Sequence, residues 1–186
     1  MTKLGFAMCG SYCTHSAALG VLRALSHEYD ITPILSSNVQ KTDTRFGTAA
    51  GLREAISSVT ENGIISTIVE SEKLAANPLD IMLICPCTGN TAAKLAAGIT
   101  DTPVTLAAKA HLRTDRPLVI ALASNDALSA NFMNIGTLLQ RKNVYFVPMR
   151  QDDTVKKPHS LVADFGQCRD ALIAAQNGRQ LRPLFV

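Results

Sequence analysis

Hydroxyl, glycine and amide residues stand between an apolar run at residues 81–85 and an alanine-rich helical pattern at residues 91–97. The start of a helix has unpaired backbone N–H groups and the positive end of the helix dipole. Residues 88–91 could therefore present an array of donors to a phosphate or a similar ligand. Because threonine and asparagine are also common N-cap residues, Thr88 or Asn90 could equally do no more than cap the helix.

Polar residues also follow the first two apolar runs of the chain. Ser11 comes shortly after residues 4–8, and Ser37 comes after residues 31–35. In a doubly wound sheet the ends of the first three strands lie near one another. Ser11, Ser37 and residues 88–91 could then contact a single ligand. Three ordinary turns, rich in turn-forming residues, are the alternative.

Short runs that are apolar throughout predict strands covered by helices on both faces. They are residues 4–8, 31–35, 81–85, 118–123 and 144–147. Helical periodicity is found at residues 17–25, 49–59, 91–97, 103–112, 132–140 and 160–176. Since parallel strands need right-handed crossovers, this alternation predicts an α/β fold with a three-layer, doubly wound parallel sheet of the flavodoxin or Rossmann type.

A single domain is expected over residues 1–186, because no Pro-rich or Gly-rich stretch divides the chain. Residues 36–47 are predicted to form a long polar loop that could cover a ligand, and residues 149–159 a second. Lys41 and Arg45 in the first loop, and His159 in the second, are candidates for binding the carboxylates of a substrate. Solvated surface positions are the alternative for all three.

Composition and motifs exclude several classes of protein. The net charge of +3 comes without a concentrated basic run, which argues against nucleic-acid binding. Neither GxGxxG nor GxxxxGK[ST] occurs, so no dinucleotide fingerprint or P-loop is supported. No segment resembles a signal peptide or a membrane span, and an odd number of cysteines, five, indicates a reducing cytoplasm. With only 18% charged residues, association of several copies is expected.

Four of the cysteines flank the first and third predicted strands: Cys9, Cys13, Cys85 and Cys87. Neither the CxxxC nor the CxC spacing is a strong ligand signature, so no metal site is predicted. A thiol in an apolar strand usually behaves as a small hydrophobic group. A reactive thiol is the alternative, since helix-start donors would lower the pKa of Cys87 if it faced them.

Both His27 and His111 are expected on the surface.

A motif of the form P-x-[TS]-x-N-T-x-x-K is present as Pro86, Thr88, Asn90, Thr91 and Lys94, followed by Gly98, Ile99 and Asp101. It resembles the flavoprotein family that includes flavin-containing cysteine decarboxylases, in which this turn follows the third main strand and binds FMN. The resemblance implies an FMN-binding flavoprotein domain with the following contacts: Gly10, Ser11 and Ser37 on the phosphate side, Pro86, Thr88, Gly89, Asn90 and Thr91 around the phosphate or isoalloxazine, and Lys94 supporting the turn. The wider family also implies a homo-oligomer of three or more copies, because its flavin sites lie at subunit interfaces.

The opening GFAMCGSYCT, the run SNDALSANFMNIGTLLQRKNVYFVPMRQDD and the later KPHSLVADF carry a narrower resemblance. They are similar to a family of small synthase subunits from endospore-forming bacteria. This resemblance implies that the chain works with a partner subunit that binds NAD(P) through a Rossmann domain. Together they would oxidise dihydrodipicolinate, a small dicarboxylate, to dipicolinate in the mother cell. No catalytic residue is identified in this chain.

Two departures from the family pattern bear on the reaction. The decarboxylases carry a histidine shortly before the motif, whereas this chain has none between His27 and His111, and the expected neighbourhood reads Ser66-Thr67-Ile68-Val69. The PxMN segment of those relatives is replaced near residues 123–125. Decarboxylation is therefore not expected. Two alternatives stay open: an FMN-dependent decarboxylase and a non-catalytic stabilising subunit. In the synthase itself, the hydride of the substrate could pass to the flavin or to the partner's nicotinamide.

Overall fold

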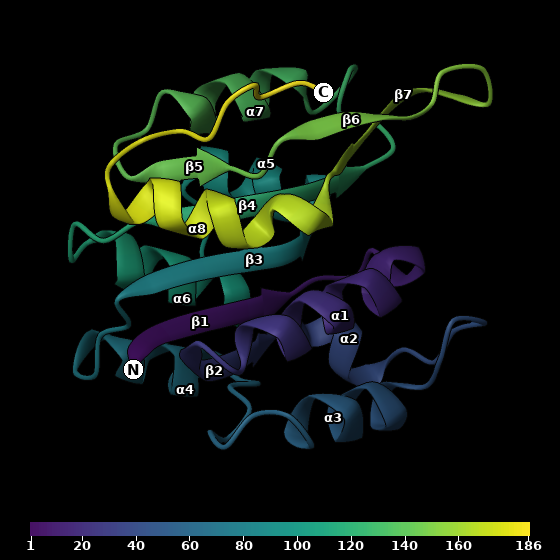
Figure 1. The fold of residues 1–186 in the computed structure, drawn as a ribbon. Coiled ribbons are helices and arrows are strands. Elements are labelled where there is room, and N and C mark those ends of the chain that lie inside the picture. Colours follow the sequence, from purple (N-terminus) through teal and green to yellow (C-terminus); the bar gives the residue numbers. More distant parts are fainter.

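The computed structural model describes residues 1–186, and its centre is a seven-stranded sheet (Figure 1). The parallel strands are β1 (Thr2–Met8), β2 (Tyr29–Leu35), β3 (Ile81–Cys87), β4 (Leu118–Ser124) and β5 (Val144–Phe146). The strands β6 (Met149–Asp153) and β7 (Lys157–Ala163) form an antiparallel hairpin. The strand order is β2-β1-β3-β4-β7-β6, with β5 also beside β4. The predicted α/β fold is confirmed, but the hairpin makes the sheet mixed rather than wholly parallel.

Helices cover the sheet on both faces, and each face has its own buried cluster. One cluster contains side chains of α1 (His15–Leu25), α2 (Ser37–Lys41), α3 (Ala49–Ser57) and α8 (Cys168–Gln176). The other contains side chains of α5 (Gly89–Ala97), α6 (Pro103–Leu112) and α7 (Phe132–Leu139), with α4 (Ile68–Glu72) packed against α6. In Figure 1, α1 and α8 lie in front of the strands, and α5 and α6 lie behind them. The three-layer arrangement is therefore as predicted.

Strand β3 shows why the central runs of the sequence are apolar throughout. Its seven residues are all buried. Ile81, Leu83 and Cys85 belong to the cluster under α1 and α8, and Met82 and Ile84 to the cluster under α5 and α6. Since successive side chains of a strand point to opposite faces, a strand between two helical layers needs apolar residues at every position.

Several predicted elements coincide with the structure because their ends carry local signals. Helix α6 begins and ends at the predicted residues, since Pro103 follows a capping box made by Thr102 and Thr105. The short helices α2 and α4 were missed: α2 lies inside the loop predicted for residues 36–47. In α4 the start is marked by a capping box between Thr67 and Glu70.

The prediction for residues 149–176 was wrong in two respects. Residues 149–159, expected as a loop, belong to the β6–β7 hairpin, and the helix expected from residue 160 begins only at Cys168. Ser160, Leu161 and Ala163 are buried as part of β7. A short apolar run fits a strand as well as a helix, and only pairing with β4 and β6 decides between them.

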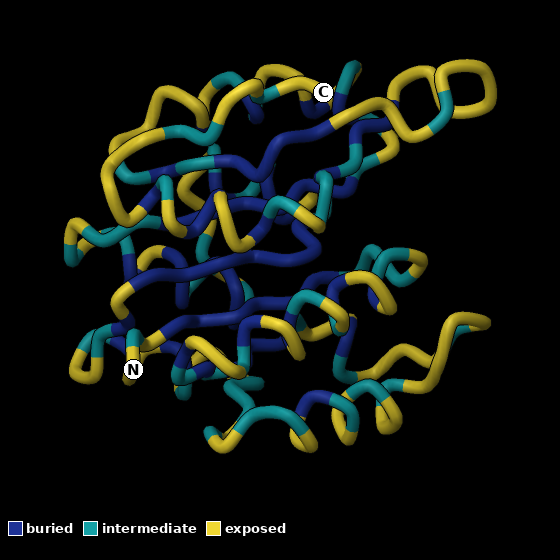
Figure 2. Tube along the Cα trace, in the orientation of Figure 1, coloured by how far each residue is buried: buried dark blue, intermediate teal, exposed yellow.

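The position of the β6–β7 hairpin follows from the pairing of β4 with two different strands along one edge. Residues 118–120 of β4 pair with β5, and Ala123 and Ser124 at its carboxyl end pair with β7. The β6–β7 hairpin therefore projects beyond the carboxyl ends of the parallel strands, where its tip is exposed (Figure 2). None of the helices combines the length and apolarity that crossing a bilayer requires.

Candidate functional site

The carboxyl ends of the first three strands meet, as the sequence predicts. Ser36 at the end of β2 donates from its backbone N–H to the Met8 carbonyl at 3.0 Å. Cys9, after β1, donates from its backbone N–H to the Pro86 carbonyl in β3 at 3.1 Å. Because backbone hydrogen bonds join all three turns, polar side chains that follow them share one edge of the sheet.

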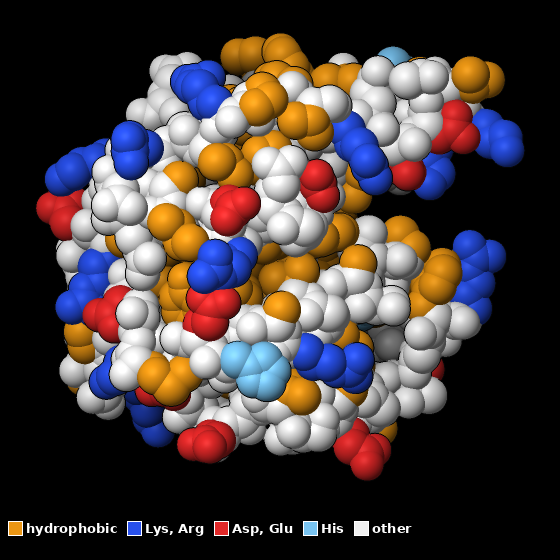
Figure 3. Space-filling model, viewed as in Figure 1, with side chains coloured by type: hydrophobic (Ala, Val, Ile, Leu, Met, Phe, Trp, Pro, Cys, Tyr) orange, Lys and Arg blue, Asp and Glu red, His pale blue; other side chains and the backbone are white.

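A cavity of about 840 Å³ opens at this edge. Its lining comes from five segments, namely residues 10–14 after β1, Arg45 and Phe46 in the loop after α2, residues 88–90 at the start of α5, residues 123–126 after β4, and Asp152, Lys157 and residues 160–162 of the hairpin. In the space-filling view the molecule is notched between the hairpin and the loop after α2, with Lys or Arg side chains on both sides of the notch (Figure 3). Ligand sites of about 300–1,000 Å³ are typical of proteins, so we call this cavity the cleft.

At the start of α5, helix capping and cleft lining are combined in one residue. Thr88 accepts a hydrogen bond at its Oγ1 from the Thr91 backbone N–H at 3.3 Å, and it also lines the cleft. Thr91 is buried and donates from its hydroxyl to Cys9 Sγ at 3.3 Å. The capping interpretation is confirmed, since Thr88 caps α5, and Asn90 is exposed at the cleft beside it, so ligand binding by residues 88–91 stays a prediction.

A polar network from the end of β4 packs against Gly89. Asp126 accepts from the Ser124 hydroxyl at one carboxylate oxygen and from Asn131 Nδ2 at 2.8 Å at the other. Asn134 Nδ2 in turn donates to Asn131 Oδ1 at 2.9 Å. The Ser124 hydrogen bond, followed by that of Asn131, lowers the pKa of Asp126. The cleft floor thus carries a fixed carboxylate beside the positive end of α5.

The structure brings half of the predicted site residues to the cleft: Gly10, Ser11, Arg45, Thr88, Gly89 and Asn90 line it. Pro86 and Thr91 lie behind the turn, where their hydrogen bonds hold Cys9. Lys94 pairs with Asp101 at 2.7 Å at the other end of α5. The remaining candidates, Ser37, Lys41 and His159, are exposed and are not among the residues that line the cleft.

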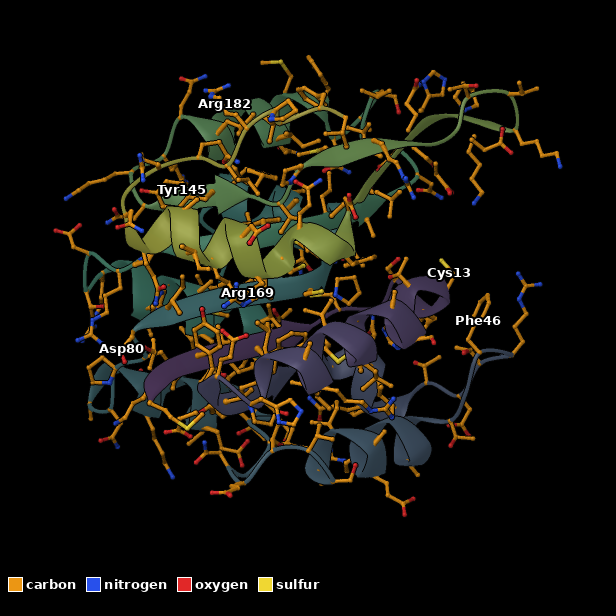
Figure 4. The ribbon with its side chains drawn as sticks, viewed as in Figure 1. Cys13, Phe46, Asp80, Tyr145, Arg169 and Arg182 are labelled. Atoms are coloured by element: carbon orange, nitrogen blue, oxygen red, sulfur yellow. The ribbon has the colours of Figure 1, made fainter.

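Arg45 and Phe46 form part of the mouth of the cleft. The guanidinium carbon of Arg45 lies 4.8 Å from the centre of the Phe46 ring, within cation–π distance. Phe46 and Cys13 lie on the same side of the opening, facing the region below the hairpin (Figure 4). The segment predicted to cover a ligand, residues 36–47, therefore contains helix α2 and then a turn, closed by hydrogen bonds between Thr44 and Gly47, that carries Arg45.

Three of the four cysteines near the strand ends are too buried to be the reactive thiol of the alternative prediction. Cys9, Cys85 and Cys87 are buried, and only Cys13 is exposed. Burial raises the pKa of the Cys9 thiol to about 11 and that of Cys87 well above its ordinary value. The expectation of a lowered Cys87 pKa is therefore wrong, because the side chain is desolvated and does not face the donors of α5. No group of three or more His, Cys, Asp or Glu side chains is arranged to hold a metal ion.

Two histidines are buried against the sheet from opposite sides. His15 in α1 makes a 2.8 Å hydrogen bond from Nε2 to the Cys9 carbonyl. His111 in α6, predicted on the surface, is instead buried and bonds the Pro117 carbonyl at 2.8 Å through Nε2. Burial lowers the pKa of both imidazoles. Neither nitrogen of His111 reaches the cleft, and its Nδ1 has no partner.

Sequence reasoning missed several polar residues around the cleft, among them Asp126, Asn131, Asp152 and Lys157. The first two follow the carboxyl end of β4, so the rule applied to the first three strands would have found them. Asp152 and Lys157 lie in the segment predicted as a loop, from which only His159 was selected, and only the folded hairpin shows which of its side chains line the cleft.

Comparison with known proteins places this chain in one family. The Flavoprotein family model matches residues 1–169, so this chain belongs to the Flavoprotein family. The B-type subunit of dipicolinate synthase from Bacillus subtilis (strain 168) is 40% identical over 186 residues, which cover 99% of this chain and 93% of that protein. The chain is therefore a homologue of that protein, and the resemblance in the sequence is confirmed.

Solved structures agree with this placement. The crystal structure of the B-type subunit of dipicolinate synthase from Bacillus halodurans C matches with a TM-score of 0.92 and 38% identity, over 100% of this chain and 96% of that chain. The FMN-dependent cysteine decarboxylase SpaF matches with a TM-score of 0.69 and 22% identity, over 94% of this chain and 97% of that chain. At that identity the second likeness shows a shared fold.

Proposed function

We propose that this chain is the B-type subunit of a dipicolinate synthase. With the A-type subunit of that synthase, a partner that binds NAD(P), it contributes to the oxidation of dihydrodipicolinate to dipicolinate. The observation that carries the proposal is the 40% identity to the Bacillus subtilis protein over 99% of this chain. The cleft supports it, because it offers a site for a small anionic ligand at the carboxyl ends of the strands.

The donor set of the cleft fits FMN. Ser11 and Thr88 offer hydroxyl groups, and Asn90 offers an amide. These groups suit a phosphate and the carbonyl oxygens of an isoalloxazine ring. Asp126 adds an acceptor on the floor, which suits the imide N–H of the ring rather than the phosphate.

In this proposal the chain's own residues bind and orient. Gly10, Ser11 and residues 88–90 would hold FMN, with Pro86 and Thr91 supporting the turn. When bound, FMN supplies a two-electron acceptor. The anionic Asp126 would stay fixed by Ser124 and Asn131 while the ligand lies above it.

Decarboxylation is the weaker alternative. Ser66 and Thr67, in the neighbourhood where a family histidine is expected, both bond the Glu70 carboxylate and start α4, and neither lines the cleft. The chain thus has no imidazole there to serve that chemistry.

Reconstitution tests the proposal directly. Dihydrodipicolinate oxidation is measured with this chain alone, with its NAD(P)-binding partner alone and with both together, each with and without FMN. We expect the highest oxidation rate when both proteins and FMN are present. If the partner oxidises dihydrodipicolinate equally fast with and without this chain, the chain makes no catalytic contribution. If this chain raises the partner's rate but binds no flavin, its role is to stabilise the partner.

The position of the flavin is tested by Asn90→Ala. Loss of one neutral hydrogen bond should weaken FMN binding roughly threefold to tenfold. Quenching of flavin fluorescence measures the affinity. Asn177→Ala, in which a helix-end amide far from the cleft is removed, serves as the control. Unchanged affinity in Asn90→Ala would show that the flavin lies elsewhere.

Two further properties belong to the proposal. We expect a homo-oligomer of three or more copies in the cytoplasm of the mother cell. Light scattering should give a mass that is at least three times the 19.9 kDa of one chain. A monomeric mass in the presence of FMN would contradict it.

A further inference from the structure

Lys157 is a cation of the cleft that the proposed FMN site does not use. It is the first residue of β7 and lines the cleft from the hairpin side, whereas Arg45 lines it from the loop after α2. These two segments project on either side of the notch (Figures 1 and 3). Positive side chains therefore approach the cleft from two separate elements.

The hairpin holds Lys157 in place through its own hydrogen bonds. Asp153 Oδ1 accepts the backbone N–H groups of Val155 at 3.0 Å and Lys156 at 2.9 Å, which orders the tip. Asp153 pairs with Lys157, whereas Gln151 pairs with Leu161, so β7 has two extra residues between these pairs. Such a bulge changes the direction of side chains along a strand. Lys157 lines the cleft, whereas His159 further along β7 does not.

Asp152 neutralises the Lys157 ammonium. The two side chains form an ion pair at the cleft, with 55% of the lysine and 43% of the aspartate side chain exposed. The hydrogen bond and charge of Asp152 raise the pKa of Lys157, so the lysine is fully protonated at neutral pH. Because an exposed pair of this kind is worth little, a ligand carboxylate can replace Asp152 at small cost.

We infer that Lys157 binds one carboxylate of a dicarboxylate substrate, that Arg45 binds the other, and that Asp152 occupies Lys157 until the substrate replaces it. This inference rests on the proposed function, which supplies the dicarboxylate. The carboxylates of dipicolinate lie on opposite sides of the ring nitrogen and point away from each other. Two cations on separate elements suit that geometry, whereas cations on a single turn do not.

Binding of dipicolinate and of picolinate, which has one carboxylate, tests the inference by calorimetry on the full chain. Lys157→Ala should bind dipicolinate roughly tenfold to a hundredfold more weakly, because it loses a charge-assisted hydrogen bond. Picolinate can still use Arg45, so its affinity should change less than about threefold. Lys157→Arg should restore the preference for dipicolinate, since its charge is kept.

Lys156→Ala is the matched control, because Lys156 is the neighbouring lysine at the hairpin tip and does not line the cleft. Its affinity for dipicolinate should equal that of the unaltered chain. Asp152→Asn should bind dipicolinate about threefold or more tightly, since the competing carboxylate is gone. Circular dichroism of each variant confirms that the hairpin change leaves the fold intact.

The inference is overturned if Lys157→Ala keeps its affinity for dipicolinate, if both ligands weaken equally, or if the unaltered chain does not bind dipicolinate. Flavin titration of the same samples separates this failure from failure of the flavin proposal. If FMN binds and Lys157→Ala still prefers dipicolinate to picolinate as strongly as the unaltered chain does, carboxylate binding by Lys157 is wrong and the flavin proposal stands. If FMN fails to bind but Lys157→Ala loses that preference, the flavin proposal is wrong and carboxylate binding by Lys157 stands.

Discussion

At the scale of single residues, Gly89 decides whether the cleft floor can form. A Cβ placed on Gly89 would meet Asn131 Nδ2 at 2.6 Å and Asp126 Oδ1 at 2.8 Å, and would also collide with the Ser124 hydroxyl. Glycine is therefore required by close approach, since its backbone is ordinary helix. The polar network and the first turn of α5 can pack together only because this position has no side chain.

Gly89→Ala should accordingly destabilise the protein by about 1–3 kcal/mol through overpacking and should weaken FMN binding. Urea denaturation and flavin titration measure the two effects. Gly20→Ala is a suitable control, because a Cβ there meets nothing within 4 Å and α1 should gain helix propensity. Unchanged stability of Gly89→Ala would mean that Ser124, Asp126 and Asn131 move aside without cost.

At the scale of elements, α5 is fixed at both ends by residues from other parts of the chain. Its start is joined to β1 through Thr91 and Cys9. Its last turn receives hydrogen bonds from Arg141, whose guanidinium reaches the Leu95 carbonyl at 2.9 Å and the Ala96 carbonyl at 3.0 Å. A cation at a helix carboxyl end also interacts favourably with the dipole. The element that carries the candidate site is thus held independently of any ligand.

Arg141→Ala should lower the free energy of unfolding by about 1–2 kcal/mol, because two carbonyl groups lose charged donors. The neighbouring Lys142→Ala should cost less than about 0.5 kcal/mol, since its pair with Asp115 is exposed. Denaturant midpoints of the two variants give the comparison. Equal midpoints would show that Arg141 contributes no more than a solvated surface charge.

At the scale of the whole molecule, one neutral imidazole is buried on each side of the sheet. His15 in α1 and His111 in α6 both have a pKa lowered by burial, so the folded state binds protons less readily than the unfolded state. Their contribution to stability is complete above the unfolded pKa of about 6.5 and is lost as the pH falls through that value toward the folded pKa. Mild acid should therefore weaken both helical layers.

Urea midpoints should be lower at about pH 5.5 than at about pH 7.5. His111→Gln should reduce the difference between the urea midpoints at the two pH values, because one of the two buried imidazoles is gone. This holds even if the substitution also changes the midpoint at the higher pH. His27→Gln, an exposed position, should leave the slope unchanged. A midpoint that rises with acidification would contradict the assignment of these imidazoles as neutral.

The sequence by itself determined the local features of this protein. Apolar strands, capping boxes and the turn at residues 86–94 act over a few residues, so strands β1 to β5 and helix α6 could be predicted, as could the meeting of the first three strand ends. The family motif predicted a flavin as the ligand, and two of its residues, Thr88 and Asn90, line the cleft.

The tertiary structure alone decided which polar residues share that cleft. Ser37 was selected by its place after a strand and by the family resemblance, and Lys41 and His159 by loop position. The direction of their side chains, however, depends on packing with distant residues. Strand pairing turned residues 149–163 into a hairpin beside β4 and brought Lys157 and Asp152 to the cleft. Long-range packing has no signature in a local pattern, which is why these residues could be found only in the folded chain.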